Sequence, residues 1–406
     1  MAGSLEKDGS PEALLVVNPE LNGRPVRIAS SRAIPGGQVA EEGFVLSSDE
    51  IATPLSARIA AAKACEIPAV ATPRTLENAW LRVEFGDDGT IHRLYDKRAG
   101  RHVLDGRGNQ IWAWRDQPRE YDAWDIEEDY RRSGEEIVAR GAIEIVEEGP
   151  QRSALRIARK HRNSTIIQSV RLWANSPRID FFTRFDWHDR RLLVQAIFPL
   201  LVRSDFATFE CAFGVHQRPT HANTSWDAAK FEVAAHRFVD LSEHGYGVAL
   251  LNDGRYGHHA LASELGISLL RSPTLPDRFA DEGAQQLTYS LFPHRGGWFE
   301  SGVLAEAEDL NRPLFHRIVR TSERGSHEFL TMRGTPCALG ALKVAEDGNG
   351  LILRVHEPAG ARGPIAFDAP KGWNISGETN LLEDAIDRPS DFIRPFEIRS
   401  FRLRPD

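Results

Sequence analysis

Strict alternation of apolar and polar side chains marks the best-defined segment of the chain. In RIDFFTRFDWH, from Arg178 to His188, the apolar set is Ile179, Phe181, Phe185 and Trp187, and the polar set is Asp180, Arg184, Asp186 and His188. A period of two residues is typical of a strand with one buried face. This segment is therefore predicted to be a half-buried antiparallel β-strand.

A second segment predicts a β-hairpin. Leu81, Val83 and Phe85 alternate with Arg82 and Glu84, and the turn sequence GDDG follows at positions 86–89. Turn-forming residues directly after an alternating run indicate two strands joined by a tight connection. Long helical patterns are scarce elsewhere, and no repeat of about 20 to 50 residues is evident. The sequence therefore predicts an all-β protein.

Composition divides the chain into four parts. Residues 1–12 are polar and are expected to be disordered or a linker. Residues 13–73 form a predicted small β domain, which ends where the two prolines of IPAVATPRT interrupt any strand. Residues 74–312 carry the densest strand pattern and suit one large sandwich. Residues 313–406, in which loops such as EPAGARGP separate short strands, are predicted to be a C-terminal β-sandwich.

Charge and cysteine usage narrow the possible partners and compartment. The net charge of −8 argues against nucleic acid or an anionic membrane as a partner, because both attract an excess of Lys and Arg, whereas a neutral sugar is compatible with it. The three cysteines are far apart and lack CxxC spacing, so neither a disulfide framework nor a structural zinc site is indicated. With no apolar run of about 18 residues and no signal-like segment, a cytoplasmic protein is expected.

The sequence DAWD is the first candidate for sugar binding. Asp122 and Asp125 flank Trp124. Carboxylates accept hydrogen bonds from sugar hydroxyls, and an indole ring stacks on the apolar face of a pyranose. The alternative is a structural loop in which the two carboxylates cap backbone amides. Two carboxylates can also form the catalytic pair of a glycosidase, but the family resemblance described below places the nucleophile elsewhere.

The second candidate is the loop-like run RPTHANTSWD, in which polar groups lie beside an aromatic ring. Its candidate residues are Arg218, His221, Asn223, Trp226 and Asp227. Irregular segments with such residues often line clefts. In the alternative interpretation, Trp226 anchors the loop in the core, and Arg218 and Asp227 form an ordinary ion pair.

The histidines do not indicate a metal site. Among 14 histidines, none has a partner four residues away in a HExxH-type context. His258 and His259 are adjacent, so on a strand their side chains point to opposite faces and cannot share one ion. Nucleotide-binding and serine-hydrolase motifs are also missing from the sequence.

Four longer segments of the sequence resemble one known enzyme family. The stretch FECAFGVHQRPTHANTSWDAAKFEVAAHRFVDLSEHGYGVALLNDGRYG, residues 209–257, resembles the C-terminal half of glycoside hydrolase family 38, the retaining α-mannosidases, in their bacterial and cytosolic branch. The resemblance continues in SLLRSPTLPD (268–277), ENAWLRVEFGDDGTIHRLYDKRAGR (77–101) and DQPREYDAWDIEEDY (116–130). It covers roughly residues 75 to 300 densely, which makes chance agreement improbable.

The resemblance implies a mutarotase-like β-supersandwich flanked by smaller β-sandwich domains. Family members hold zinc and the nucleophilic carboxylate in an N-terminal barrel followed by a helical bundle, and neither is evident in this chain. No catalytic residue, metal ligand or cofactor is therefore expected here, and zinc is expected in the missing catalytic domain. Arg271 is similar in position to a basic residue that other members direct toward the substrate.

These observations predict the C-terminal portion of a retaining α-mannosidase, which supports the absent barrel and lines the rim of the mannoside cleft. The expected partners are an α-mannoside and the missing catalytic domain, and the isolated chain is expected to be inactive and to self-associate. One alternative is a carbohydrate-binding or assembly module that acts alone. Another is an aldose epimerase, which would need a His and a Glu facing each other in a concave sheet.

Overall fold

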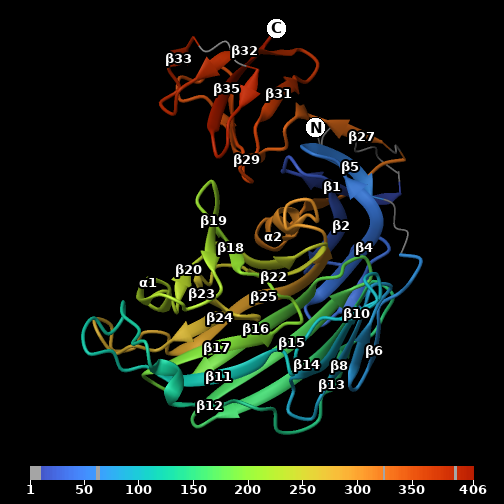
Figure 1. The fold of residues 1–406 in the computed structure, drawn as a ribbon. Helices are drawn as coiled ribbons and strands as arrows, with labels where there is room; N and C mark the ends of the chain where they lie inside the picture. Colours follow the sequence, from blue (N-terminus) through green and yellow to red (C-terminus); the bar gives the residue numbers. More distant parts are fainter. Residues whose placement is uncertain (1–10, 61–64, 323–324, 388–390) are drawn as a thin grey trace.

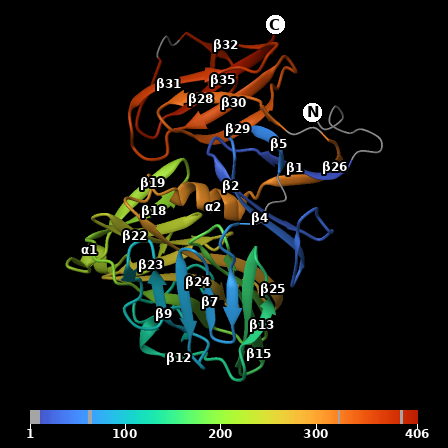
Figure 2. The ribbon, with the colours of Figure 1, turned by 90° about the vertical axis from the view of Figure 1, so that its right-hand side faces the viewer.

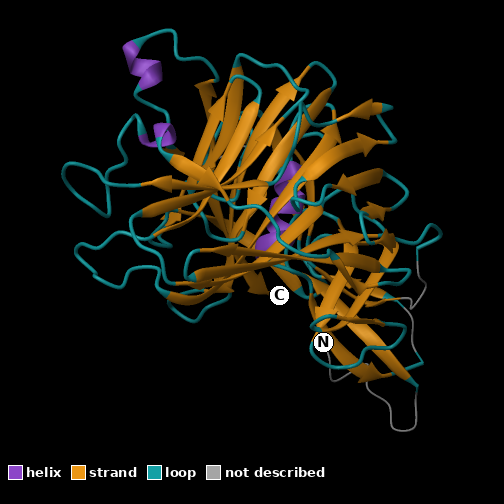
Figure 3. Cartoon of the chain, turned by 90° about the horizontal axis from the view of Figure 1, so that it is seen from below, coloured by secondary structure: helices purple, strands orange, loops and turns teal. Residues whose placement is uncertain are grey.

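A computed structural model describes residues 11–60, 65–322, 325–387 and 391–406. Strands form nearly all of its regular structure (Figure 3). Within the described residues, regular helix is confined to α1 (Ser225–Ala228), α2 (Val303–Asn311) and the single 3-10 turn η2 (Tyr130–Arg132). The predicted all-β class is confirmed.

Two large antiparallel sheets form the central sandwich, in the lower part of Figure 1. The six-stranded sheet consists, in spatial order, of β12 (Gly134–Glu136), β11 (Gln110–Arg115), β17 (Leu192–Pro199), β24 (Glu264–Arg271), β23 (Gly257–Leu261) and β20 (Val233–Ala234). The nine-stranded sheet consists of β13 (Glu144–Glu147), β14 (Arg152–His161), β15 (Ser164–Trp173), β16 (Ile179–Trp187), β25 (Gly283–Arg295), β22 (Tyr246–Asn252), β21 (Phe238–Glu243), β18 (Phe206–Cys211) and β19 (Gly214–Pro219).

The largest core lies between these sheets. Buried side chains from the six-stranded sheet, such as Val194 and Ile267, belong to the same cluster as Ile157 and Phe181 of the nine-stranded sheet. A five-stranded sheet contributes to this core too. Its strands are β10 (Arg101–His102), β9 (Ile91–Asp96), β8 (Leu81–Phe85), β7 (Thr75–Glu77) and β6 (Val70–Thr72).

Both segments predicted from alternation form the expected elements. The apolar set of the first segment lies on the core face of β16, and β8 pairs with β9 as the expected hairpin. One polar residue departs from the pattern: Asp180 is buried, and the guanidinium of Arg178 donates to its Oδ1 at 2.7 Å. A buried carboxylate with a charged partner keeps its hydrogen bonds, so the strand tolerates it.

A small sandwich lies beside the central one, on the right of Figure 1. One of its sheets is β26 (Phe315–Arg320), β1 (Glu12–Asn18), β5 (Ser56–Ala60) and β27 (Ser326–Glu328), and the other is β2 (Arg24–Ser30), β4 (Gly43–Ala52) and β3 (Gln38–Ala40). Strands β26 and β27 come from the segment that the sequence-based division assigned to the C-terminal unit. The chain therefore returns to the first sandwich before it enters the last one.

The last part of the chain forms a separate sandwich, at the top of Figures 1 and 2. One sheet is β29 (Ala338–Val344), β30 (Leu351–His356), β35 (Ile398–Pro405), β32 (Trp373–Thr379) and β33 (Ala385–Ile386), and the other is β28 (Thr331–Gly334), β31 (Gly363–Asp368) and β34 (Phe392–Ile393). Its core includes Leu353, Ile365 and Leu403, and Leu21 and Leu55 from the first part of the chain belong to the same cluster. The predicted small β-sandwich domains beside a large one are thus present.

Helix α2 connects the first sandwich to the central one. Arg27 of β2 donates to Glu306 of α2 at 2.9 Å, and Arg178 donates to Asp309 of α2 at 3.0 Å. These groups are nearly all buried, so their mutual hydrogen bonds offset the cost of removing the charges from water. The first sandwich and the central sandwich are therefore held at a defined angle.

No helix in the described part of the chain is long and apolar enough to cross a membrane.

Candidate functional site

The loop between β11 and η2 carries the first group of predicted site residues. Its turn is closed by the amides of Trp124 and Asp125, which donate to the carbonyl of Tyr121 at 2.7 and 2.9 Å. Tyr121 has a positive φ of 53°, which such a tight turn requires. The turn leaves the indole of Trp124 71% exposed. An aromatic side chain on a fixed turn, facing solvent, is available for a ligand.

Asp122 fastens this loop to the loop after β24. Its Oδ2 accepts hydrogen bonds from the amide of Thr274 at 2.6 Å, the hydroxyl of Thr274 at 3.1 Å and the amide of Leu275 at 2.9 Å. Burial alone would raise the pKa of Asp122, but these hydrogen bonds and the charge of Arg191 lower it. The capping role considered for this carboxylate is therefore the one it has in the structure.

Arg271, at the end of β24, bonds to two points of the loop between β11 and η2. Its guanidinium donates to the carboxylate of Asp116 and to the backbone carbonyl of Asp125. Burial raises the pKa of Asp116 despite the opposing charge of Arg271. The structure thus places Arg271 against the loop that carries Asp122 and Asp125, although Arg271 lies 146 residues after Asp125 in the sequence.

The second group of predicted residues surrounds α1. The hydroxyl of Thr224 accepts from the amide of Asp227 at 3.1 Å and donates to its carboxylate at 2.7 Å, which caps this one-turn helix. Nδ1 of His221 lies 3.8 Å from the same carboxylate, and the amide of Asn223 donates to this nitrogen at 3.4 Å. These residues therefore form one small, mutually bonded loop.

The structural alternative for this loop is wrong in two respects. Trp226 is 80% exposed and does not anchor the loop in the core. The guanidinium of Arg218 lies over the ring of Phe209, 5.5 Å from its centre, and Asp227 takes its contacts from Thr224 and His221 rather than from Arg218. The indole of Trp226 is free to contact a ligand.

Both groups lie at the same end of the central sandwich, on the left of Figure 1. Tyr130 connects them: its ring lies 6.2 Å from that of Phe231, and its hydroxyl donates to Glu232 at 2.5 Å. Tyr130 follows the Trp124 loop, and Glu232 follows α1. Two exposed tryptophans are therefore carried by neighbouring loops at the same end of the central sandwich.

A buried polar cluster under these loops was not predicted from the sequence. Nδ1 of His259 lies 3.0 Å from Glu232, and Nε2 lies 3.1 Å from Glu264. Arg131 donates to Glu264 at 2.7 Å, and Gln195 donates to Glu232 at 2.8 Å. No sequence motif marks the two carboxylate partners of His259, because Glu232 is distant in the sequence and Glu264 lies on the neighbouring strand.

The prediction that His258 and His259 point to opposite faces of a strand is confirmed. His258 contacts the amide of Asn252 at 3.3 Å, whereas His259 faces the carboxylates. The His259 ring packs on Gly266, where a β-carbon would lie 1.9 Å from the ring, so only glycine fits. The two imidazoles therefore occupy different environments.

Electrostatics fix the charge of this cluster. Burial alone would lower the pKa of His259, but the charge of Glu232 and the hydrogen bonds to both carboxylates raise it to about 9. Burial would raise the pKa of Glu264, but His259 and Arg131 lower it to about 2. His259 is 3% exposed and both its nitrogens are occupied. The cluster is therefore a charged network, in which His259 carries a proton at neutral pH and Glu264 does not.

No group of three or more His, Cys, Asp or Glu side chains in the described residues is arranged to hold a metal ion. The residues present here therefore do not fit a zinc ion.

Two family models match the chain. The Glycosyl hydrolases family 38 C-terminal domain matches residues 76–279, and the family 38 C-terminal beta sandwich domain matches residues 337–401. Both groups of candidate residues lie within the first match. The second match lies within the last sandwich.

Curated relatives and solved structures agree with these models. Alpha-mannosidase 2C1 of Homo sapiens is 36% identical over 323 residues, which cover 78% of this chain and 31% of that protein. Alpha-mannosidase G of Dictyostelium discoideum is 32% identical over 350 residues, 81% of this chain and 32% of that protein. A family 38 protein from Enterococcus faecalis has the same fold, with a TM-score of 0.76 at 16% identity, over 98% of this chain and 58% of that one. The chain spans about a third of the length of the curated relatives it matches.

Proposed function

The chain belongs to glycoside hydrolase family 38, and from that premise we propose that it is the C-terminal portion of a retaining α-mannosidase that lines the rim of the mannoside cleft. The names of its relatives support the substrate, since those that cover most of this chain are α-mannosidases. The hydrolytic step, with its zinc ion and nucleophilic carboxylate, takes place in a catalytic domain outside this chain.

The pair of exposed tryptophans carries the rim proposal. Trp124 and Trp226 lie on two neighbouring loops, each fixed by hydrogen bonds, and both indoles face solvent. Indole rings stack on the apolar face of a pyranose, and polar side chains beside them orient its hydroxyls. Asp125, Asn223 and His221 provide such polar groups on the same loops.

The partners follow from this role. The catalytic domain packs against the β-rich portion, and the surface it covers stays exposed when this chain is expressed alone, so the isolated chain self-associates. The compartment is the cytoplasm, and neither nucleic acid nor membrane is a partner.

A carbohydrate-binding module that acts alone would use the same two tryptophans, so activity assays have to separate the two functions.

The experiment compares variants of the full-length protein that contains this chain. Trp124→Ala and Trp226→Ala should each lower kcat/KM for a chromogenic α-mannoside by roughly tenfold, because losing about 1.4 kcal/mol of transition-state binding has that effect. Neither should change the melting temperature, since both indoles are exposed. Phe315→Ala, a ring 65% exposed on the first sandwich, is the matched control and should leave kcat/KM unchanged. Unchanged kcat/KM in both tryptophan variants would refute the rim role.

A further inference from the structure

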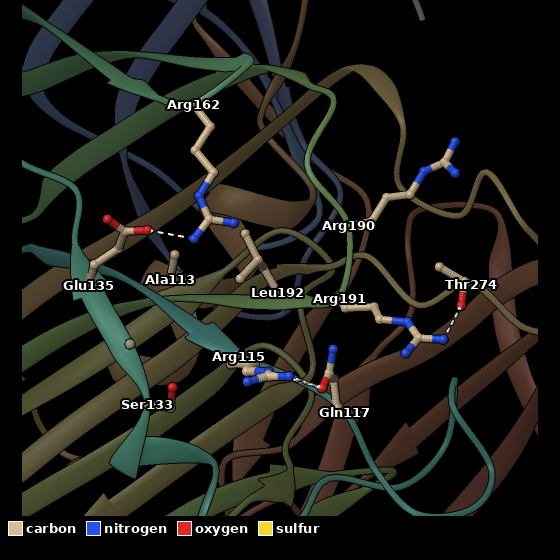
Figure 4. Close-up of a pocket in the computed structure, with 11 residues that line it drawn as sticks. Ala113, Arg115, Gln117, Ser133, Glu135, Arg162, Arg190, Arg191, Leu192 and Thr274 are labelled. Carbon is tan, nitrogen blue, oxygen red and sulfur yellow. Dashed lines mark hydrogen bonds and ion pairs between the residues drawn. The ribbon is translucent and has the colours of Figure 1, made fainter.

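An open pocket of about 720 Å³ lies at one end of the central sandwich, beside the proposed sugar rim. Its floor contains Ala113 of β11 and Leu192 of β17, whose strands are paired in the six-stranded sheet. Four arginines line its walls: Arg115, Arg162, Arg190 and Arg191 (Figure 4). Glu135 is the one acidic side chain among the lining residues.

Two of these arginines donate hydrogen bonds only to neutral side chains among the described residues, although the charge of Arg191 also acts on the carboxylate of Asp122. Arg115 donates to the amide oxygen of Gln117 at 2.6 and 2.9 Å, and Arg191 donates to the hydroxyl of Thr274 at 3.3 Å. By contrast, Arg162 pairs with Glu135 and Arg190 pairs with Glu282, each at 2.9 Å. The carboxylate of Glu135 also contacts Nε2 of His161 at 2.9 Å.

The pocket is therefore a positive region on an acidic protein. Its lining side chains carry four positive charges and one negative charge, whereas the whole chain carries a net charge of −8. Guanidinium groups left with neutral partners in an open pocket attract an anion, and their planar donors match the oxygens of phosphate or carboxylate. Figure 4 shows Arg162 and Glu135 on one side of the pocket and Arg191 and Thr274 on the other.

We propose that this pocket binds a phosphate group, carried by a sugar whose ring lies against the neighbouring rim loop. A phosphate monoester offers three terminal oxygens, so it can accept from Arg115 and Arg191 together, whereas one arginine fork already satisfies a carboxylate. Ser133 and Thr274 add hydroxyl groups to the lining. The ligand class is a phosphorylated carbohydrate.

Thr274 connects the pocket to the rim. Its hydroxyl accepts from Arg191 at 3.3 Å and donates to Asp122 at 3.1 Å, so the wall of the pocket and the anchor of the Trp124 loop share one side chain. A phosphate held by Arg191 would therefore lie close to the Trp124 loop, because Thr274 bonds both Arg191 and the Asp122 of that loop. The identity of the sugar as a mannoside rests on the proposed function, whereas the phosphate site does not.

Calorimetric titration of the 406-residue chain at low ionic strength tests the proposal with three probes: inorganic phosphate, mannose 6-phosphate and mannose. Both phosphate probes should bind with one site per chain, and mannose 6-phosphate should bind more tightly. The double variant Arg115→Gln/Arg191→Gln should weaken both by at least tenfold, because a hydrogen bond to a charged group contributes about 1.5–3 kcal/mol. Its melting temperature without ligand should match the unmodified chain, since both side chains are exposed.

The matched control is Arg93→Gln/Arg295→Gln, which removes the same charge from two exposed arginines outside the pocket. This control variant should change the affinity for inorganic phosphate and the affinity for mannose 6-phosphate by less than twofold each. The proposed phosphate site would be wrong if the unmodified chain does not bind phosphate. It would also be wrong if both double variants weaken phosphate binding equally, or if the pocket variant binds phosphate as tightly as the unmodified chain. Equal affinity for the two phosphate probes would overturn the claim that a sugar carries the phosphate. No hydrolysis is measured, so a failure of the mannosidase proposal would leave these results unaffected.

Discussion

The guanidinium of Arg271 donates a hydrogen bond to the backbone carbonyl of Asp125, 146 residues earlier in the chain. The same guanidinium pairs with Asp116, whose carboxylate is almost fully buried. One side chain thus fixes the Trp124 loop against the end of the six-stranded sheet. The position of the Trp124 loop depends on this contact.

Replacing Arg271 should destabilise the chain. Arg271→Met leaves the buried carboxylate of Asp116 without its charged partner, and breaking a buried pair in this way costs about 3 kcal/mol. Chemical denaturation measures the loss. Arg190→Met, which breaks the exposed pair with Glu282, is the control and should cost less than about 1 kcal/mol. Equal losses in the two variants would show that Arg271 does not hold the Trp124 loop.

Removing the Asp122 carboxylate should loosen the loop after β24. Asp122→Ala deletes the acceptor of three hydrogen bonds from Thr274 and Leu275, so their amides should exchange faster with solvent. The global cost should be on the order of 1 kcal/mol, because the loop is open to water. Hydrogen exchange read by NMR is the measurement. Unchanged exchange at both amides in Asp122→Ala would contradict the anchoring role.

The two adjacent histidines should titrate far apart. His259 should lose its proton near pH 9, because Glu232 and Glu264 hold its pKa above the usual value, and His258 should titrate near 4, because burial lowers its pKa. The stabilisation from charged His259 is complete below its unfolded-state pKa of about 6.5 and is lost as pH rises through 9. NMR of the imidazole nitrogens reports both values. Titration of His259 at or below pH 6.5 would show that the carboxylate pair does not hold its proton.

Asp227 tests whether the α1 loop is functional or only structural. Asp227→Ala in the full-length protein should lower kcat/KM roughly ten- to a hundredfold, because a hydrogen bond to a charged group contributes about 1.5–3 kcal/mol. The cap that this residue forms with Thr224 belongs to one exposed helical turn, so the melting temperature should change little. Both quantities are measured on one preparation. Full activity with a lowered melting temperature would remove this loop from the site.

Sequence patterns predicted the fold well where alternation is regular. The faces of β16 and the β8–β9 hairpin follow directly from the period of two, because one side of each strand must enter the core. The return of β26 and β27 to the first sandwich could not be predicted in this way. Strand pairing between distant segments leaves no mark on the spacing of apolar residues within either segment.

The candidate site was predicted only in part. Residue type identified Trp124 and Trp226 as groups for a sugar ring, and their exposure agrees with that use. Residue type could not assign Asp122, since a carboxylate that caps amides and one that binds hydroxyls have the same sequence signature. The partners of His259 and the four-arginine pocket were missed because their members come from separate strands and turns. Only the folded sheet brings them together.

The central claim is that this chain supports and lines an α-mannosidase cleft, while the chemistry takes place in another domain. The most direct measurement is hydrolysis of a chromogenic α-mannoside, with metal analysis, by the purified 406-residue chain and by the full-length protein side by side. We expect no turnover and no stoichiometric zinc in the chain alone, and turnover with bound zinc in the full-length protein. Robust zinc-dependent turnover by the 406-residue chain alone would contradict it.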